Sequence, residues 1–212
     1  MNIVVRGGEG QITAKKSRFI GQLFPVRSEA DALSVLDGVR KKYWDARHHV
    51  YAYVTDSGRI RHFSDDGEPA GTGGRPVLEV LTRAELTGSL LVVTRYFGGT
   101  LLGTGGLTRA YGAAAEAALA SAVTAELIAG KSYRLQLTYQ QAGKLEWLAR
   151  ESGGILLDTT YQETVTARML IPDETETDFL SRTADIFAGK VIAEDEGEKA
   201  YYRDEKGNVH YI

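Results

Sequence analysis

The stretch Ser89–Ala122, SLLVVTRYFGGTLLGTGGLTRAYGAAAEAALASA, decides the fold of the first half of this chain. Its first part, SLLVVTRYF (89–97), has the continuous apolar, β-branched character of a buried strand. Its last part (107–122) is rich in alanine and predicts a helix that lets a neighbouring element pack closely. The Gly-rich loop GGTLLGTGG (98–106) joins strand to helix and is a candidate site.

Upstream of this stretch the pattern predicts mixed strands and helices. Residues 9–26 alternate and then run apolar, which predicts strand structure closed by Pro25. Ser28 is the predicted cap of a helix that extends to Tyr43, with Asp31 in a near capping box.

A hairpin and a second loop complete the first half. Residues 49–55 and 59–64 predict two antiparallel strands joined by a short turn. The Asp- and Gly-rich loop DDGEPAGTGGR (65–75) then leads into a short helix predicted from Pro76 to about residue 85.

The chain changes character over residues 123–133, where a turn is predicted at Gly130-Lys131. We therefore expect two domains, 1–130 and 131–212. The sequence of the second domain predicts the order strand, helix, strand, strand, helix, strand. This is the order of elements in the ferredoxin-like split βαβ fold. A hairpin is also expected around Lys206-Gly207-Asn208. The fold class predicted for the whole chain is α+β.

Composition narrows the classes of function. The chain has 212 residues with 43% hydrophobic content and no cysteine, which excludes disulfides, thiolate nucleophiles and Cys-ligated zinc. Residues 1–130 carry 15 Lys and Arg against 13 Asp and Glu, and residues 131–212 carry 10 against 15, so neither half is a basic nucleic-acid-type domain. No signal sequence or run of about 18 apolar residues is present, and we expect a cytoplasmic protein without membrane contact.

The Gly-rich loop predicts an anion site. Successive glycines permit positive φ and close backbone approach, and the loop begins a helix whose dipole favours an anion. Arg95, Thr104 and Arg109 supply side-chain donors. The alternative is that the glycines only permit tight turns and close helix-to-sheet packing. The full predicted binding set is Arg95, Tyr96, Gly98, Gly99, Gly103, Thr104, Gly105, Gly106 and Arg109.

The acidic loop leaves two interpretations open. Asp65, Asp66 and Glu68, with His48, would suit a divalent metal or the activation of water. The other interpretation is a turn in which the two aspartates accept backbone N–H groups and Glu68 pairs with an arginine. The spacing is not that of a calcium-binding loop and no nucleophile or nucleotide-binding motif is present, so we predict no catalytic residue, functional metal or cofactor.

Several segments resemble the signature of the IMPACT/YigZ family. They are Arg95-Tyr96-Phe97-Gly98-Gly99, Leu102-Gly103-Thr104-Gly105-Gly106-Leu107, Arg109-Ala110-Tyr111, Ser64-Asp65-Asp66-Gly67-Glu68-Pro69 with Gly71-Thr72 and Gly74-Arg75-Pro76, Lys16-Ser17-Arg18-Phe19-Ile20, and Asp45-Ala46-Arg47-His48. This chain departs from the family pattern at Leu101, where many members carry a lysine. The absence of that lysine removes a phosphate-contacting charge.

The resemblance implies both a fold and a class of function. The first domain would be similar to domain 2 of a small-subunit ribosomal protein, S-five, and to domain IV of elongation factor G. The second would be similar to domain V of that factor. Eukaryotic relatives regulate translation under starvation by binding the activator of a kinase that phosphorylates an initiation factor. We therefore expect a non-enzymatic binding protein that contacts a protein, the ribosome or RNA, with a metal-dependent phosphoesterase or nucleotide hydrolase and a nucleic-acid-binding protein as alternatives.

Overall fold

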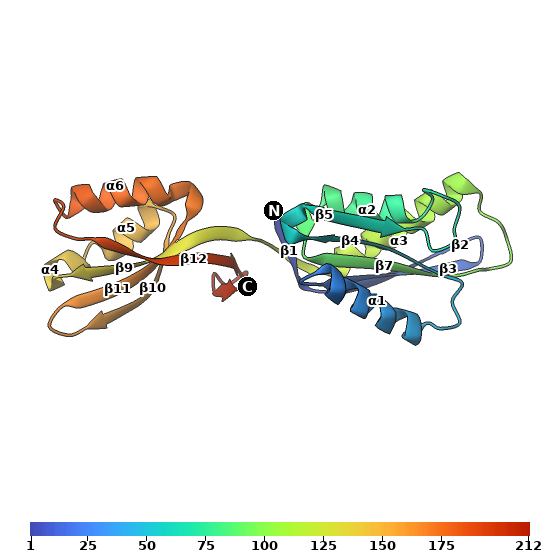
Figure 1. Cartoon of the computed structure of the whole chain (residues 1–212), viewed down its shortest axis with the longest axis horizontal. Helices are drawn as coiled ribbons and strands as arrows, with labels where there is room; N and C mark the ends of the chain where they lie inside the picture. The colour runs from blue at the N-terminus through green and yellow to red at the C-terminus, as the bar shows by residue number, and fades with distance from the viewer. The chain divides into compact units, whose positions relative to one another are not determined.

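The computed structural model describes residues 1–212 and divides into two units, Met1–Glu126 and Leu127–Ile212. Each unit has its own hydrophobic core and at least one sheet (Figure 1), and the chain is an α+β protein with three sheets in total. The division falls at Glu126, whereas the sequence predicted a boundary at residue 130. No helix has both the length and the apolar character that crossing a bilayer requires.

The main sheet of the first unit has the order β2-β3-β7-β4-β5, and every neighbouring pair is antiparallel. Its strands are β2 (Gly8–Ala14), β3 (Ser17–Pro25), β4 (His48–Thr55), β5 (Ile60–Ser64) and β7 (Ser89–Tyr96). Strand β7 lies at the centre and is buried over residues 89–95, which confirms the buried strand predicted from its apolar run.

Both faces of this sheet are covered, which explains the lack of polar alternation in β4 and β7. Helices α2 (Gly74–Arg83) and α3 (Thr104–Ser121) cover one face, where Leu91 and Val93 of β7 are buried. Helix α1 (Glu29–Lys42) covers the other face over Leu90 and Val92. Ser28 caps α1 as predicted, because its Oγ accepts from the backbone N of Asp31 at 3.2 Å.

The alanines of α3 allow the close packing that the sequence predicted. A Cβ added at Gly21 of β3 would lie 2.2 Å from the carbonyl oxygen of Ala114, and one at Gly10 of β2 would lie 2.4 Å from the carbonyl carbon of Ala117. Glycine on the strands and alanine on the helix therefore bring the two backbones together, and larger side chains at either position would push α3 away from the sheet.

The small third sheet was not predicted. Strand β1 (Asn2–Arg6) pairs in parallel with β6 (Leu86–Thr87) and antiparallel with β8 (Val123–Glu126). Strands β6 and β8, of two and four residues, carry too few residues for a periodic signal, and the partners of β1 lie far along the chain.

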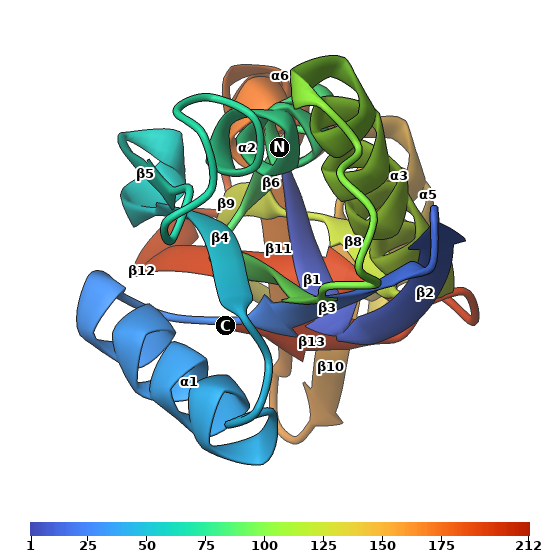
Figure 2. The same ribbon diagram turned by 90° about the vertical axis from the view of Figure 1, so that its right-hand side faces the viewer.

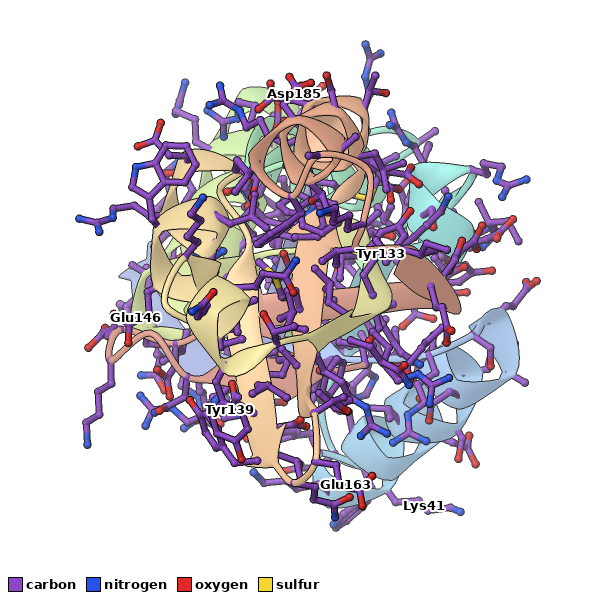
Figure 3. The ribbon with its side chains drawn as sticks, turned by 90° about the vertical axis from the view of Figure 1, so that its left-hand side faces the viewer. Lys41, Tyr133, Tyr139, Glu146, Glu163 and Asp185 are labelled. Atoms are coloured by element: carbon purple, nitrogen blue, oxygen red, sulfur yellow. The ribbon has the colours of Figure 1, made fainter.

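The second unit has one sheet of order β10-β11-β9-β12-β13. Its elements are β9 (Ile128–Leu137), α4 (Tyr139–Ala142), α5 (Leu145–Glu151), β10 (Ile155–Tyr161), β11 (Val165–Pro172), α6 (Glu176–Ile186), β12 (Ala193–Arg203) and β13 (Val209–Tyr211). The predicted succession of strands and helices is present, as is the final hairpin. Figure 3 labels Tyr139, whose hydroxyl donates to the carbonyl oxygen of Gln162 in the β10–β11 connection at 2.7 Å.

Two local predictions in this unit are wrong. The turn expected at Gly130-Lys131 is instead part of β9. A Cβ at Gly130 would lie 2.4 Å from the carbonyl oxygen of Ile171, so this glycine permits close strand pairing instead of a turn. The single helix expected between the first two strands of the second domain is divided into α4 and α5, which are separated by Gly143-Lys144.

Candidate functional site

The loops that carry the sequence motifs meet at one edge of the first unit's main sheet. Arg18 at the start of β3 pairs with Tyr96 at the end of β7, and His48 at the start of β4 pairs with Arg95. The β7–α3 loop, the β5–α2 loop and the α1–β4 connection therefore lie together, at the edge that faces the viewer in Figure 2. Motifs separated by about 80 residues of sequence thus form one surface.

A cleft of about 500 Å³ opens at this edge. Its walls come from the α1–β4 connection, the acidic loop and the Gly-rich loop. The lining residues are Arg47, His48, Gly67, Glu68, Pro69, Arg95, Phe97, Leu101, Leu102, Gly103, Thr104 and Leu107.

Glu68 is the centre of a buried polar network in the cleft wall. Its Oε1 accepts from Nη1 of Arg95 at 2.5 Å and from the hydroxyl of Tyr111 at 2.8 Å, and Nε2 of His48 lies 3.7 Å away. The side chains of Arg95 and Glu68 are only 6% and 4% exposed. Burial, and then the adjacent carboxylate of Glu68, raise the pKa of Tyr111, which keeps its hydroxyl a neutral donor.

Arg95 is held on several sides. Its Nη2 is 3.4 Å from the Oγ of Ser17, which also accepts from the backbone N of Gly98 at 3.1 Å. Its guanidinium carbon lies 5.3 Å from the ring centroid of Phe19 and 5.5 Å from that of Phe97. Its Nε is buried without a hydrogen-bond partner. Arg95, which the sequence predicted as a side-chain donor to an anion, is therefore a buried cation in the wall that already donates to Glu68 and Ser17.

The aspartates of the acidic loop shape the backbone. The carboxylate of Asp65 accepts from the backbone N of Gly71, Gly73 and Gly74, each at 2.8 Å, and so caps the start of α2. Burial alone would raise the pKa of Asp65, but these three hydrogen bonds together hold it below the ordinary aspartate value. This is the bonding that the turn interpretation predicts.

The carboxylate and the backbone carbonyl of Asp66 bond to a different set of partners. Its Oδ2 accepts from the backbone N of His49 at 2.6 Å and its Oδ1 pairs with Arg40 at 3.1 Å. Its carbonyl oxygen lies 2.7 Å from Nδ1 of His48, which orients that imidazole with Nε2 towards Glu68. Asp65 and Asp66 therefore do not converge with Glu68, and no three His, Asp or Glu side chains of the chain are grouped so that they could hold a metal ion.

The Gly-rich segment is divided between loop and helix. Helix α3 begins at Thr104, three positions before the predicted Leu107, so Thr104, Gly105 and Gly106 form its first turn. Gly99 and Gly103 have φ values of 78° and 75°, which favour glycine. Gly98 is required for packing, because a Cβ there would lie 2.0 Å from the carbonyl carbon of Lys16.

Only Arg95, Gly103 and Thr104 of the nine predicted binding residues line the cleft, and the other six, which include Tyr96 and Arg109, lie outside its lining. The hydroxyl of Tyr96 donates to Asp45 at 2.7 Å, and the guanidinium of Arg18 lies 4.5 Å from its ring centroid. Arg109 is exposed on α3 and forms no ion pair.

Sequence reasoning missed the roles of Ser17, Arg47, Phe97 and Tyr111. All four lie inside the motif segments, but their partners are distant in sequence. A tyrosine within an alanine-rich helix is the one local signal, since a bulky polar group there needs a buried partner.

The comparisons with known proteins agree with this layout. The model of the Impact N-terminal domain matches residues 15–119, and that of a domain of unknown function, DUF1949, matches residues 135–190. The IMPACT family member YvyE of Bacillus subtilis is 36% identical over 199 residues, which are 93% of this chain and 91% of the relative. This chain belongs to the IMPACT family.

Other relatives cover most of the chain as well. The family member YigZ of Escherichia coli is 38% identical over 180 residues, which are 84% of this chain and 88% of the relative. The crystal structure of a hypothetical protein aligns with a TM-score of 0.58 at 36% identity and covers 91% of this chain and 95% of that chain. The structure of the two-domain translational regulator Yih1 aligns with a TM-score of 0.37 at 26% identity and covers 56% of this chain and 48% of that chain.

Proposed function

We propose that this IMPACT family member is a non-enzymatic binding protein whose binding surface is the loop edge of the first unit. The observation that carries the proposal is the cleft at that edge, which brings together three motif segments while its carboxylates are already bonded within the fold. A hydrolase that uses a metal needs carboxylates that converge on the ion. Asp65 and Asp66 instead bind backbone N–H groups, which favours binding over hydrolysis.

The process we propose is regulation of translation or of a stress response, by contact with a protein, the ribosome or RNA. This rests on the family, whose eukaryotic members have that role. The surface suits such a contact, because Trp44, Phe97 and Leu101 are 82%, 42% and 81% exposed and Arg47 lies beside Phe97. Exposed aromatic and arginine side chains are typical of residues that dominate binding energy at interfaces.

We further infer a ferredoxin-like fold for the second unit, similar to domain V of elongation factor G. The strand order β10-β11-β9-β12, with its two crossover segments of helix, supports this. The likeness of the first unit to a ribosomal-protein domain stays a prediction.

Cosedimentation with purified ribosomes and with ribosomal RNA tests the proposed function. We expect binding by the parent that is weakened at least tenfold in an Arg47→Ala, Phe97→Ala double variant. The matched control is Arg134→Ala, which removes an exposed arginine from the second unit. Equal binding by the edge variant and the control would contradict the proposed surface, and turnover of a phosphoester that Asp66→Asn abolishes would support the hydrolase instead.

A further inference from the structure

Five cationic side chains around the loop edge have no counter-ion in the protein. They are exposed, and none of them takes part in an ion pair. They are Lys15, Lys16, Arg18, Arg47 and Arg109, and we call them the cationic edge. They come from the β2–β3 turn, the start of β3, the α1–β4 connection and helix α3, so the fold gathers them and not the sequence.

Contacts with the β7–α3 loop bring these cations onto one surface. The Nζ of Lys15 donates to the carbonyl oxygen of Leu101 at 3.4 Å. The guanidinium carbon of Arg47 lies 6.0 Å from the ring centroid of Phe97. Arg18 directly follows the β2–β3 turn and pairs with the last residue of β7. The cations therefore flank the Gly-rich loop on two sides.

The carboxylates of the same loops do not offset these charges. Asp65, Asp66 and Glu68 are bonded within the fold, as described above. Asp45 is the one exposed carboxylate in the connecting loops of this edge. The near balance of charge over residues 1–130 hides this local excess, in which five free cations stand against one free carboxylate. Such an excess favours a partner that carries several negative charges.

The Lys15-Lys16 turn is unfavourable for the hairpin that carries it. The two residues join β2 to β3 between the paired Ala14 and Ser17, and their φ values are 43° and 66°. Turns with positive φ at both central positions favour Asn-Gly, because a Cβ is strained there. Strain that persists in a fold is concentrated at functional positions. Here it presents two cations beside the Gly-rich loop.

Exposed aromatic rings lie among the cations. Trp44 is 82% exposed in the connection that carries Arg47, and Phe97 is 42% exposed in the wall of the 500 Å³ cleft. Aromatic planes beside cations suit a single nucleic-acid strand, because its bases stack on the rings while its phosphates are neutralised. A duplex keeps its bases stacked inside, and an acidic peptide matches the charge alone.

We propose that the cationic edge binds single-stranded nucleic acid, with phosphates on its lysines and arginines and bases stacked on Trp44 and Phe97. RNA and DNA strands share this chemistry, and their relative affinities decide between them. The inference rests on the proposed function, because it names the chemical class of the partner of the same edge.

Fluorescence anisotropy with a labelled strand of about 12 nucleotides, a length that single-strand-binding folds cover, tests the proposal. We expect the single strand to bind at least tenfold more tightly than its duplex and than a glutamate peptide of equal charge. Because a single strand contributes about 0.7 to the salt slope for each neutralised phosphate, five cations predict a slope of about −3.5 for log K against log[salt].

The nucleic acid probes separate the possible partners. Tighter binding of RNA than of DNA assigns the surface to RNA, and equal affinities assign it to single strands of either kind. A duplex or a glutamate peptide that binds as tightly as the single strand would overturn the assignment.

A change in the β2–β3 turn separates binding from folding. Lys15→Asn, Lys16→Gly gives the turn its favoured residues, so the thermal midpoint should stay or rise. The affinity for the strand should fall at least tenfold, and the salt slope should shrink by about 1.4, because two cations are lost. The matched control Lys144→Asn, Lys190→Asn removes two exposed lysines from the second unit and should bind like the parent. Equal affinities of the two variants would refute the inference.

The chain has two tryptophans, which allows stacking to be observed directly. Trp147 lies on α5 of the second unit, so Trp147→Phe leaves Trp44 as the one source of tryptophan fluorescence. The strand should quench this fluorescence, and inorganic polyphosphate, which has no bases, should not. Unchanged fluorescence at saturation, or no strand binding by the parent, would refute the inference. Ribosome binding that Arg47→Ala, Phe97→Ala weakens would still support the proposed function in that case.

Discussion

The two units use the same chemical pair, an arginine with a glutamate, in opposite settings. In the first unit Arg95 and Glu68 are 6% and 4% exposed and lie in a cleft wall with Tyr111 and His48. In the second unit Arg134 and Glu194 are 42% and 50% exposed on adjacent strands β9 and β12. Water screens the second pair and not the first, so only the first fixes the geometry of its surroundings. The contrast locates the candidate site in the first unit.

The largest expected loss of stability comes from breaking the buried pair of Arg95 and Glu68. Glu68→Ala leaves the Arg95 cation buried without a counter-charge, and we expect the free energy of unfolding to fall by about 3–5 kcal/mol. Urea unfolding read by hydrogen exchange in peptides of β7 measures the first unit separately. The double variant Glu68→Leu, Arg95→Met should recover part of the loss. A loss under about 1 kcal/mol, the size typical of exposed pairs, would contradict the contrast.

A smaller loss is expected when the cap of α2 is removed. Asp65→Ala leaves the backbone N–H groups of Gly71, Gly73 and Gly74 without their acceptor, which should cost about 1–3 kcal/mol. Urea unfolding at neutral pH measures this cost. The neighbouring Asp66→Ala, which removes different contacts, serves as the comparison, and an unchanged urea midpoint for Asp65→Ala would refute the capping role.

The same carboxylate predicts part of the acid dependence of stability. Because the folded-state pKa of Asp65 lies below its ordinary value, its contribution is present above the unfolded-state pKa of about 3.9 and is lost as the pH falls through the folded-state pKa. The urea midpoint of the parent should therefore fall more steeply below pH 4 than that of Asp65→Asn. Parallel pH profiles for the two proteins would show that the depressed pKa has no part in stability.

Almost no loss of stability is expected when the exposed pair of Arg134 and Glu194 is broken. Arg134→Ala removes the contact with Glu194 from a solvated sheet face, and we expect the urea midpoint to stay within measurement error of the parent. Hydrogen exchange in peptides of β9 provides the measurement. A clear shift would mean that the pairs of the two units are closer in strength than their exposure implies.

Separating the units should leave the first one folded. Residues 1–126 contain two hydrophobic clusters and all the partners of β1 and β7, so this fragment should unfold cooperatively in urea. The fragment 1–122, which keeps all of α3 but lacks β8, is the control and should be less stable. Loss of cooperative unfolding in 1–126 would contradict independent folding.

Long periodic segments made most of the fold predictable. The apolar run of β7, the Ser28 cap and the two-unit layout could be inferred because each depends on local pattern. Gly130 was misread, since a glycine that permits close strand pairing has the same local signature as one that forms a turn. Strand β1 was missed because its partners lie far along the chain.

The candidate site was predictable in place but not in detail. The Gly-rich and acidic motifs indicated the correct loops, and Glu68 does pair with an arginine. The sequence could not show that Arg95 is buried, that Tyr111 donates to Glu68, or that Gly98 is required for close packing against Lys16. Each of these facts depends on a contact between segments brought together only by the sheet register.

Strand β1 and its sheet partners are synthesised at different times during translation of the first unit. Residues 2–6 are made before the rest of the unit, but their partners at 86–87 and 123–126 are translated much later. The nascent chain can therefore pair β1 with β6 once residue 87 has left the ribosome, but the three-stranded sheet must wait for residue 126. Since β8 directly precedes the second unit, the first unit can complete its smallest sheet only after translation of the second has begun.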